Sequence, residues 1–570
     1  MKKILYTALA LLFASGAFVV SCSEEFLDKE PIGALSEGVL ANADGIESTL
    51  IGAYALLDGF TPGVNQWMAT TTNWVYADVY ADDAYKGTDV GDQPQINPME
   101  RYEHLADNDY PWNKWRAMYD GIARTNDVLR LTARAREEGA IGDALATQFE
   151  AEARFLRGFY HFELTRLFDN VPYVDETVEG DFLVENTGSP WAQVEADFQF
   201  AADNLPEEPR NGQVGRATKW AAEGFLGKTK IYQGNYSGAL PHFNTIINSG
   251  QFQLTENFHD NFRADGDNNS ESIFQYQASI NDGAGGGQNG NFGDILNFPY
   301  TAGPGACCGF HQPSQNLVNA YQTENGLPLL EDFNANDVKS DQGIGSGEPF
   351  EPHTGPLDPR LDWTVGRRGI PYLDWGPHPG RDWIRDQNYG GPYSPKKRVY
   401  YKAEEGVNSN AGGWGGGTTS NNYNIMRYAD VLLMAAEAEV EAGNLEKARE
   451  YVNMIRERAA NPDFFVKNED GTPAADYQIS TYDDPWTDQN VARQAVRFER
   501  RLELALEGHR FFDLKRWGVA EQVLNEYLAE ESKKRTYLQG ATFTEQYLRQ
   551  PIPLNAIDRS QGTLTQNPGF

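Results

Sequence analysis

Residues 427–455 read RYADVLLMAAEAEVEAGNLEKAREYVNMI, and this stretch predicts a pair of consecutive helices. Gly443 and Asn444 form the turn between them, because glycine ends a helix in a left-handed conformation and asparagine caps the next helix. Apolar side chains on both sides of the turn recur three and four residues apart, which places them on one face of each helix. They are Tyr428, Val431, Leu432 and Ala435 in the first helix and Ala448, Tyr451, Val452 and Ile455 in the second.

The same pattern occurs earlier in the chain, at residues 234–246. Gly234 and Asn235 form the turn, and the face of the helix that follows carries Ala239, His242, Phe243 and Ile246. Helix pairs with a glycine turn and a small alanine at the crossing resemble tetratricopeptide units. Ala239 and Ala448 are 209 residues apart, so the two pairs do not belong to an uninterrupted tandem array. Further helices are expected at 147–168, 191–204 and 491–517.

Residues 281–420 differ in composition from the helical segments. They contain 26 of the 56 glycines and 13 of the 29 prolines, too many for regular helices. Residues 360–414 also hold four of the twelve tryptophans, whereas flexible linkers are poor in aromatic residues. We therefore expect one mostly α-helical domain, residues 22–570, in which helix pairs form a scaffold, mainly at 40–280 and 421–570, packed against an ordered, loop-rich, ligand-binding insertion at 281–420.

The first residues have the pattern of an exported lipoprotein. Lys2 and Lys3 precede an uncharged apolar stretch that is too short for a confident membrane span. Val19-Val20-Ser21-Cys22 resembles a bacterial lipobox, so residues 1–21 are expected to be a signal peptide and Cys22 to carry the lipid anchor. A plain secretory signal with a chance cysteine is the alternative, but the whole chain has only three cysteines.

The composition excludes several classes of protein. Apolar residues make up 40% of the chain and charged residues 23%, which rules out a disordered chain and a polytopic membrane protein. The 82 acidic residues outnumber the 48 basic residues, for a formal net charge of −34. A field this negative does not attract nucleic acid. We expect a globular protein without a nucleic-acid partner.

An ordered set of sequence blocks resembles the SusD/RagB family of outer-membrane nutrient-binding lipoproteins. The most specific block, ERRLELALEGHRFFDLKRWG, covers residues 499–518. The others are residues 22–28, 151–160 continuing to Val171-Pro172, 269–274, 358–360, 426–433 with 436–438, and 566–570. The segment Ser23-Glu24-Glu25 after the anchor is similar to the acidic signal that sends lipoproteins of the Bacteroidota to the outer face of the outer membrane.

The resemblance implies both a fold and a function. The implied fold has four tetratricopeptide-like helix pairs packed against the loop-rich segment. Family members lie on the extracellular mouth of a SusC-like TonB-dependent barrel, where they act as a hinged lid that captures oligosaccharides, or less often peptides, for import. They are not enzymes. The charged residues of block 499–518 are therefore expected to form structural ion pairs and not a catalytic cluster.

Two aromatic-rich segments are candidates for the ligand-binding surface, namely residues 67–92 and 367–414. A sugar gains most of its binding free energy when its flat C–H face stacks on an aromatic ring beside a few fixed polar groups. An arginine next to such a ring offers a planar fork of hydrogen-bond donors to the sugar hydroxyl groups. Many of these rings could instead pin the loops to the helical body. The residues selected as stacking faces and polar partners are Trp74, Asp83, Tyr85, Arg368, Trp375, Tyr389 and Trp414.

Two further features leave alternatives open. The aspartates at 78–89 suit Ca²⁺, but their spacing lacks a complete calcium-loop pattern, so no metal or cofactor is assigned. Cys307 and Cys308 are adjacent, and a bond between them would close a strained eight-membered ring. A bonded pair that presents a rigid apolar surface to a sugar and a pair of reduced buried thiols are equally compatible with the sequence.

The sequence thus predicts a lipid-anchored protein on the extracellular face of the outer membrane. Its expected function is to capture oligosaccharides and deliver them, unaltered, to a SusC-like TonB-dependent transporter. Three alternatives remain, namely a secreted glycoside hydrolase, a structural subunit of the transporter complex that binds no ligand, and a peptide-binding member of that complex.

Overall fold

The computed structural model describes residues 37–178, 183–284, 288–301, 303–305, 307–410 and 417–570. The predicted signal peptide, Cys22 and Trp414 therefore lie outside the described residues. The first part of the chain is built from helices packed in sequence order. They are α3 (Glu37–Leu40), α4 (Ala43–Ala55), α6 (Asp109–Glu137), α7 (Asp143–Phe168), α8 (Trp191–Asn204), α9 (Lys219–Tyr232) and α10 (Tyr236–Ile247).

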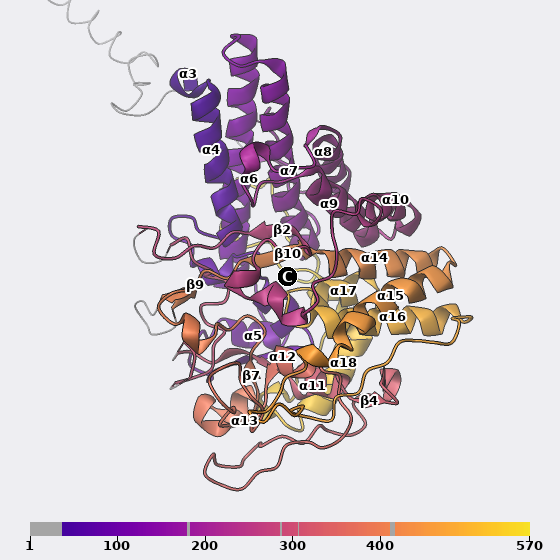
Figure 1. Cartoon of the computed structure of the whole chain (residues 1–570). Coiled ribbons are helices and arrows are strands. Elements are labelled where there is room, and N and C mark those ends of the chain that lie inside the picture. The colour runs from indigo at the N-terminus through magenta and orange to yellow at the C-terminus, as the bar shows by residue number, and fades with distance from the viewer. Residues whose placement is uncertain (1–36, 179–182, 285–287, 302, 306, 411–416) are drawn as a thin grey trace, which may run out of the picture.

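The close approach of α6 and α7 depends on a glycine. A Cβ atom at Gly121 in α6 would lie 2.6 Å from the ring of Tyr160 in α7, so a larger residue would push the two helices apart. Asn108 caps the N-terminus of α6, because its side chain accepts a hydrogen bond from the backbone nitrogen of Tyr110. Figure 1 shows α4, α6 and α7 standing side by side.

The second helical segment follows the loop-rich insertion. It contains α14 (Tyr428–Glu441), α15 (Leu445–Ala459), α16 (Gln489–Leu504), α17 (Arg510–Arg516), α18 (Ala520–Glu531) and α19 (Leu554–Arg559). Both predicted glycine turns adopt the left-handed conformation, with φ of 71° at Gly234 and 83° at Gly443. The predicted mostly helical fold with paired helices is confirmed.

Two contacts join the helical segments across the insertion. α10 packs against α14, which makes the helices continuous in space although about 180 residues separate them in the chain. β2 (Ser272–Tyr276) pairs antiparallel with β10 (Tyr423–Arg427), so the strands on either side of the insertion lie next to each other. In Figure 1 the purple helices α8–α10 lie directly above the orange helices α14–α16.

One predicted helix, at 491–517, is broken in the structure. α16 ends at Leu504 and α17 begins at Arg510. Leu506 and Gly508 between them have φ of 61° and 72°. A Cβ atom at Gly508 would lie 2.3 Å from the carbonyl oxygen of Thr72, so the break brings the chain against the N-terminal part of the protein.

The insertion contains short elements held by its own small core. Its elements include β3 (Phe310–Pro313), α11 (Gln315–Ala320), β4 (Thr323–Glu324), β5 (Leu327–Pro328), α12 (Leu361–Thr364), β6 (Val365–Gly366), α13 (Gln387–Gly390), β7 (Ser394–Pro395), β8 (Ser409–Asn410) and β9 (Thr418–Thr419). A separate apolar cluster packs within it, consisting of Phe298, Tyr372, Trp383, Val399 and Tyr400, with Trp375 at its edge. The predicted ordered, loop-rich segment is thus observed.

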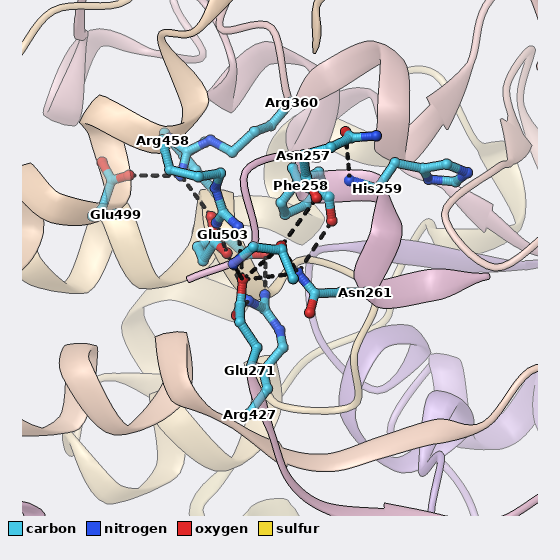
Figure 2. A network of polar contacts seen from close by, with 12 residues as sticks. Asn257, Phe258, His259, Asn261, Glu271, Arg360, Arg427, Arg458, Glu499 and Glu503 are labelled. Atoms are coloured by element: carbon cyan, nitrogen blue, oxygen red, sulfur yellow. Dashed lines mark hydrogen bonds and ion pairs between the residues drawn. The ribbon is translucent and has the colours of Figure 1, made fainter. Parts of the chain in front are cut away.

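A buried network of charges fastens the insertion to the helices (Figure 2). Its core is Glu503, whose carboxylate pairs with Arg360 of the insertion, with Arg427 at the end of β10, and with Arg458 of α15. Ion pairs connect ten residues, five of each sign: Asp358, Glu271, Glu499, Glu503 and Glu507 with Arg360, Lys397, Arg427, Arg456 and Arg458. The charges of this network therefore cancel in the interior, as buried ions require.

Among the described residues, no helix is at once long enough and apolar enough to cross a lipid bilayer.

Candidate functional site

The two aromatic-rich segments meet at one place on the loop-rich face. Nε of Arg385 lies 2.7 Å from Oδ2 of Asp89, and its Nη1 lies 2.7 Å from Oδ2 of Asp92. The hydroxyl group of Tyr389 donates a hydrogen bond of 2.8 Å to Oδ1 of Asn97. We call Asp89, Asp92, Asn97, Tyr300 and Arg385 the loop junction.

The acidic side of the loop junction is a tight turn after β1 (Ala84–Gly87), which pairs with β3. Oδ1 of Asp89 accepts hydrogen bonds from the backbone nitrogens of Gly91 and Asp92. Nζ of buried Lys86 donates to the carbonyl oxygens of Asp89 and Asp92, both at 2.8 Å. Burial lowers the pKa of Lys86 to about 8. These bonds fix both carboxylates in place before any ligand arrives.

Tyr300 brings a third segment to the loop junction. Its backbone nitrogen donates to the carbonyl oxygen of Trp383, and its half-buried ring lies 5.3 Å from the guanidinium carbon of Arg385. A guanidinium over a tyrosine ring is a favourable cation–π contact. The side chain of Arg385 is 31% exposed, and its Nη2 has no hydrogen-bond partner among the described residues. A partly exposed ring and a free planar donor therefore lie side by side.

The cysteine pair lies in the same loop as Tyr300. Cys307 and Cys308 are joined by a disulfide bond in the structure, and Cys308 is buried while Cys307 is half-buried. The loop closes through a hydrogen bond from the nitrogen of Gly309 to the carbonyl oxygen of Phe298. Contact between this pair and a sugar stays a prediction.

Three predicted ligand residues are buried instead, and these predictions are corrected. Trp74 is 1% exposed and packs on the rings of Phe310 and His311. Tyr85 is fully buried, and its hydroxyl group donates to Glu531. Asp83 lies 2.8 Å from Nε of Arg501. Residues 74–87 form a π-helical turn (Val75–Val79) and β1 beneath the C-terminal helices, where they carry packing and ion pairing.

Two further predicted residues pin the loops. The Nη2 atom of buried Arg368 donates to the carbonyl oxygens of Ser346 and Glu348. Tyr389 is 7% exposed and stacks on Tyr537, with ring centroids 4.3 Å apart. Neither side chain offers a free surface to a ligand. The alternative that rings hold the loops in place therefore applies to Tyr389.

Trp375 keeps a partly exposed ring. Its indole nitrogen donates to the carbonyl oxygen of Tyr400, and Nζ of exposed Lys402 lies 5.8 Å from its ring. Trp375 therefore remains a candidate stacking surface.

The sequence reasoning missed Arg385 and Tyr300. Arg385 lies inside the predicted segment 367–414, between Trp383 and Tyr389, and only this position marks it. Tyr300 lies outside both segments, and no sequence signal singles it out.

The aspartates considered for Ca²⁺ face basic groups in the structure. Oδ2 of Asp78 lies 3.0 Å from Nε2 of His311, and Asp82 pairs with Arg501 and Arg510. Burial alone would raise the pKa of Asp82, but the two arginines lower it to about 2. No group of three side chains suited to a metal ion occurs among the described residues. A cation would have to displace the guanidinium groups.

The architecture defines a helix-pair scaffold that carries a structured loop face. A family model described as "SusD family" matches residues 270–570, and one described as "Starch-binding associating with outer membrane" matches residues 25–232. The chain belongs to the SusD family.

Known relatives resemble this chain over nearly its whole length. The SusD-like protein P25 of Formosa agariphila is 25% identical over 562 residues, which cover 94% of each chain. Among solved structures, a laminarin-binding SusD-like protein is 22% identical with a TM-score of 0.67 and covers 93% of this chain and 100% of its own. Surface glycan-binding protein A from Bacteroides thetaiotaomicron in complex with laminarihexaose is 20% identical with a TM-score of 0.68, covering 92% and 99%. These structures share the fold.

Proposed function

We propose that this protein captures a glycan at the loop junction, on the cell surface, and delivers it unaltered to a TonB-dependent outer-membrane barrel. Family membership supports the proposal, as do similar proteins that bind laminarin or laminarihexaose. The observation that carries it is the partly exposed pair of Tyr300 and Arg385 where three loop segments meet.

The loop junction offers what a sugar ring needs. The face of a pyranose stacks on an aromatic ring, and Tyr300 presents one that is partly open. Adjacent hydroxyl groups accept hydrogen bonds from a planar guanidinium, and Nη2 of Arg385 is free to donate them. The carboxylates of Asp89 and Asp92 are held in place and can accept bonds from other sugar hydroxyls. Trp375, whose ring is partly exposed, is a second candidate stacking surface in the insertion.

The proposal includes no catalysis. A glycoside hydrolase needs one carboxyl group to donate a proton and another to act as base or nucleophile. Asp89 and Asp92 both pair with the guanidinium of Arg385. The loop junction therefore has no carboxyl group, among the described residues, that is not already in an ion pair.

The proposed location rests on the N-terminal pattern. Lipid chains on Cys22 would anchor the protein by burying methylene groups, at about 0.8 kcal/mol each. The family description that names association with the outer membrane is consistent with this anchor. Replacing Cys22 by Ser should move the protein from the membrane fraction to the soluble fraction; an unchanged distribution would refute anchoring through this residue.

Affinity electrophoresis in gels that contain single polysaccharides tests the binding. The wild type should be retarded by at least one glycan without release of reducing ends. Tyr300→Ala and Arg385→Ala should each weaken binding by about 1–3 kcal/mol, or roughly 5- to 150-fold. Trp375→Ala, which removes a candidate stacking ring, should also weaken binding by this amount.

Arg263→Ala is the matched control. Arg263 also lies over a tyrosine, Tyr401, at 4.7 Å, and pairs with two aspartates, Asp260 and Asp265. It contacts no loop-junction residue, so its replacement should leave retardation unchanged. Equal retardation of wild type and the two junction variants would refute the site. Release of reducing ends would favour a hydrolase, and co-purification with the barrel without glycan affinity would favour a structural or peptide-binding subunit.

A further inference from the structure

Lys86, which bonds to the acidic turn of the loop junction, is fully buried in β1. Three other buried lysines, Lys114, Lys228 and Lys397, each have a carboxylate oxygen within 3.2 Å of their ammonium nitrogen. Lys86 has no such partner among the described residues, and of the buried lysines there only Lys396 shares this lack. A buried ammonium group without a counter-ion lowers the stability of a fold, so its presence here calls for a local role.

The ammonium group of Lys86 is bonded to the turn at two points. Nζ donates one hydrogen bond to the carbonyl oxygen of Asp89 and another to that of Asp92, both at 2.8 Å. The carboxylates of the same two aspartates each lie 2.7 Å from a nitrogen atom of Arg385. The backbone of each aspartate is thus bonded to Lys86, while its side chain is bonded to Arg385.

The same ammonium group contacts a second segment. Nζ lies 4.8 Å from the ring centroid of Tyr389 in α13, and this ring stacks on Tyr537. The hydroxyl group of Tyr537 donates to Oε1 of Glu100 at 2.6 Å, and the backbone nitrogen of Lys86 donates to the same oxygen at 3.1 Å. Glu100 ends α5 (Ile96–Glu100), which is labelled in Figure 1, as is α13. The contacts close a ring through four segments, and the cation–π contact is the link that needs a positive charge.

Charged groups from three parts of the chain face Lys86. They are the carboxylates of its own turn, Asp89 and Asp92, together with Glu100 of α5 and Arg385 of the insertion. Burial outweighs the three carboxylates and lowers the pKa of Lys86 from 10.5 to about 8. Burial also raises the pKa of Glu100 from 4.5 to about 7, and it raises the pKa of Tyr389 and of Tyr537, so that both tyrosines stay neutral.

The ammonium form of Lys86 is therefore present at neutral pH and is lost slightly above it. A neutral amine keeps hydrogen-bond donors, but it forfeits the cation–π contact with Tyr389. Its hydrogen bonds to the turn are also weaker, because an ionised donor makes them about twice as strong.

We propose that Lys86 is the positioning residue of the loop junction: its ammonium group holds the turn 88–92 where the two carboxylates bind Arg385, and loss of its positive charge releases the turn and weakens glycan capture. The weakened capture rests on the proposed function, whereas the hold on the turn does not.

Hydrogen–deuterium exchange of the turn, followed by mass spectrometry, tests the hold without any ligand. The backbone nitrogens of Gly91 and Asp92 donate to Oδ1 of Asp89, so their exchange reports whether the turn is closed. At pH 7 both amides should exchange about 10-fold faster in Lys86→Met than in wild type. At pH 9.5, with labelling times scaled to the pH, the two proteins should exchange alike, because the wild-type amine is then neutral.

Urea unfolding separates positioning from a merely structural role. Lys86→Met removes a buried charge without a counter-ion, and the two carbonyl groups that it leaves are only partly buried. Its unfolding midpoint should therefore be no lower than that of the wild type. A lower midpoint with faster exchange throughout the chain would show a structural role and overturn the proposal.

Lys396→Met is the matched control. Lys396 is also buried without a carboxylate partner, donates to two carbonyl oxygens, those of Asp362 and Pro371, and lies near aromatic rings. It contacts no residue of the turn, so the exchange of Gly91 and Asp92 should stay as in wild type. Equal release of the turn by Lys396→Met would overturn the proposal, as would unchanged exchange in Lys86→Met or a difference from wild type that is the same at both pH values.

Glu100→Gln gives a second measurement, which serves if Lys86→Met folds poorly. The amide keeps an acceptor for Tyr537 and for the backbone of Lys86 but removes a negative charge that raises the pKa of Lys86. The pH at which the turn opens should fall by about half a unit or more relative to wild type. An opening pH that stays the same or rises would contradict the role of Lys86.

Laminarin gels at pH 7 and pH 9.5, each compared with a gel without polysaccharide at the same pH, test the effect on capture. Wild type should be retarded less at pH 9.5, and Lys86→Met should be retarded weakly at both pH values. Equal retardation of wild type at both pH values, with the turn open at pH 9.5, would overturn the link to capture. A turn that opens as expected in a protein that no polysaccharide retards at pH 7 would support the role of Lys86 and refute glycan capture.

Discussion

Glu507 gives a quantitative test of the buried charge network. Its carboxylate accepts two hydrogen bonds from Arg427, at 2.8 and 2.9 Å, and one from Nζ of Lys397, at 2.6 Å. Burial alone would raise the pKa of Glu507, but Arg427 and Lys397 lower it from 4.5 to about 2. At 1.36 kcal/mol for each tenfold change in the proton equilibrium, this difference corresponds to about 3 kcal/mol of stability at neutral pH.

Glu507→Gln keeps the size of the side chain and removes its charge. Because Arg427 and Lys397 lose a counter-ion, the free energy of unfolding should fall by about 3–5 kcal/mol at pH 7. A carboxyl group with a lowered pKa stabilises the folded state above its unfolded pKa and loses this effect as the pH falls. The difference between wild type and variant should therefore shrink between about pH 4.5 and pH 2.

Urea unfolding at pH 7 and pH 3, followed by circular dichroism, measures both effects. Glu450→Gln is the control, because Glu450 is 59% exposed and pairs with Lys447 on the surface. An exposed pair contributes about 0–1 kcal/mol, so this variant should be close to wild type. A loss below about 1 kcal/mol for Glu507→Gln at pH 7, or a loss that does not change with pH, would refute the assigned role of the network.

Two further predictions concern stability. Burial raises the pKa of Asp58 from 3.8 to about 7, so the wild type should lose stability as the pH rises through this range. Between pH 4 and pH 8, Asp58→Asn should gain stability relative to the wild type by up to about 4 kcal/mol in urea unfolding. A stability difference between the two proteins that does not change with pH would contradict this. Gly121→Ala should lose about 1–3 kcal/mol because its Cβ meets the ring of Tyr160. Gly142→Ala, with open space around it, is the control, and equal stability of the two variants would disprove the tight helix crossing.

The helical scaffold was predictable from sequence because its signals are local. The glycine turns at Gly234 and Gly443 and the spacing of apolar residues around them depend only on neighbours in the chain. The break at 505–509 was not predictable in this way. Its residues continue a helical pattern, and the reason for the break is the distant backbone of Thr72, which lies against Gly508.

The candidate site was predictable only as a pair of segments. The sequence marks where aromatic and charged residues gather, and Arg385 shows that the two segments do meet. The sequence does not show which of these side chains are buried. The partner that buries Tyr85 is Glu531, 446 residues away, and the partner of Asp83 is Arg501, 418 residues away. Burial by such distant partners leaves no trace in a local pattern.

The broken helix explains how the scaffold controls the loop junction. The last carbonyl groups of a helix lack partners within it, and here the insertion supplies them: Lys397 donates to the carbonyl oxygens of Glu503 and Ala505, and Arg398 to that of Leu506. Arg398 also holds both carboxylate oxygens of Asp294, at 2.8 and 2.9 Å. Asp294 begins the stretch that leads to Tyr300, so the C-terminus of α16 positions the ring proposed to receive the sugar. A continuous helix through residues 505–509 would leave both basic side chains without these acceptors and the loop without its anchor. The break is therefore part of what orders the binding surface in advance, which reduces the entropy lost when a ligand binds.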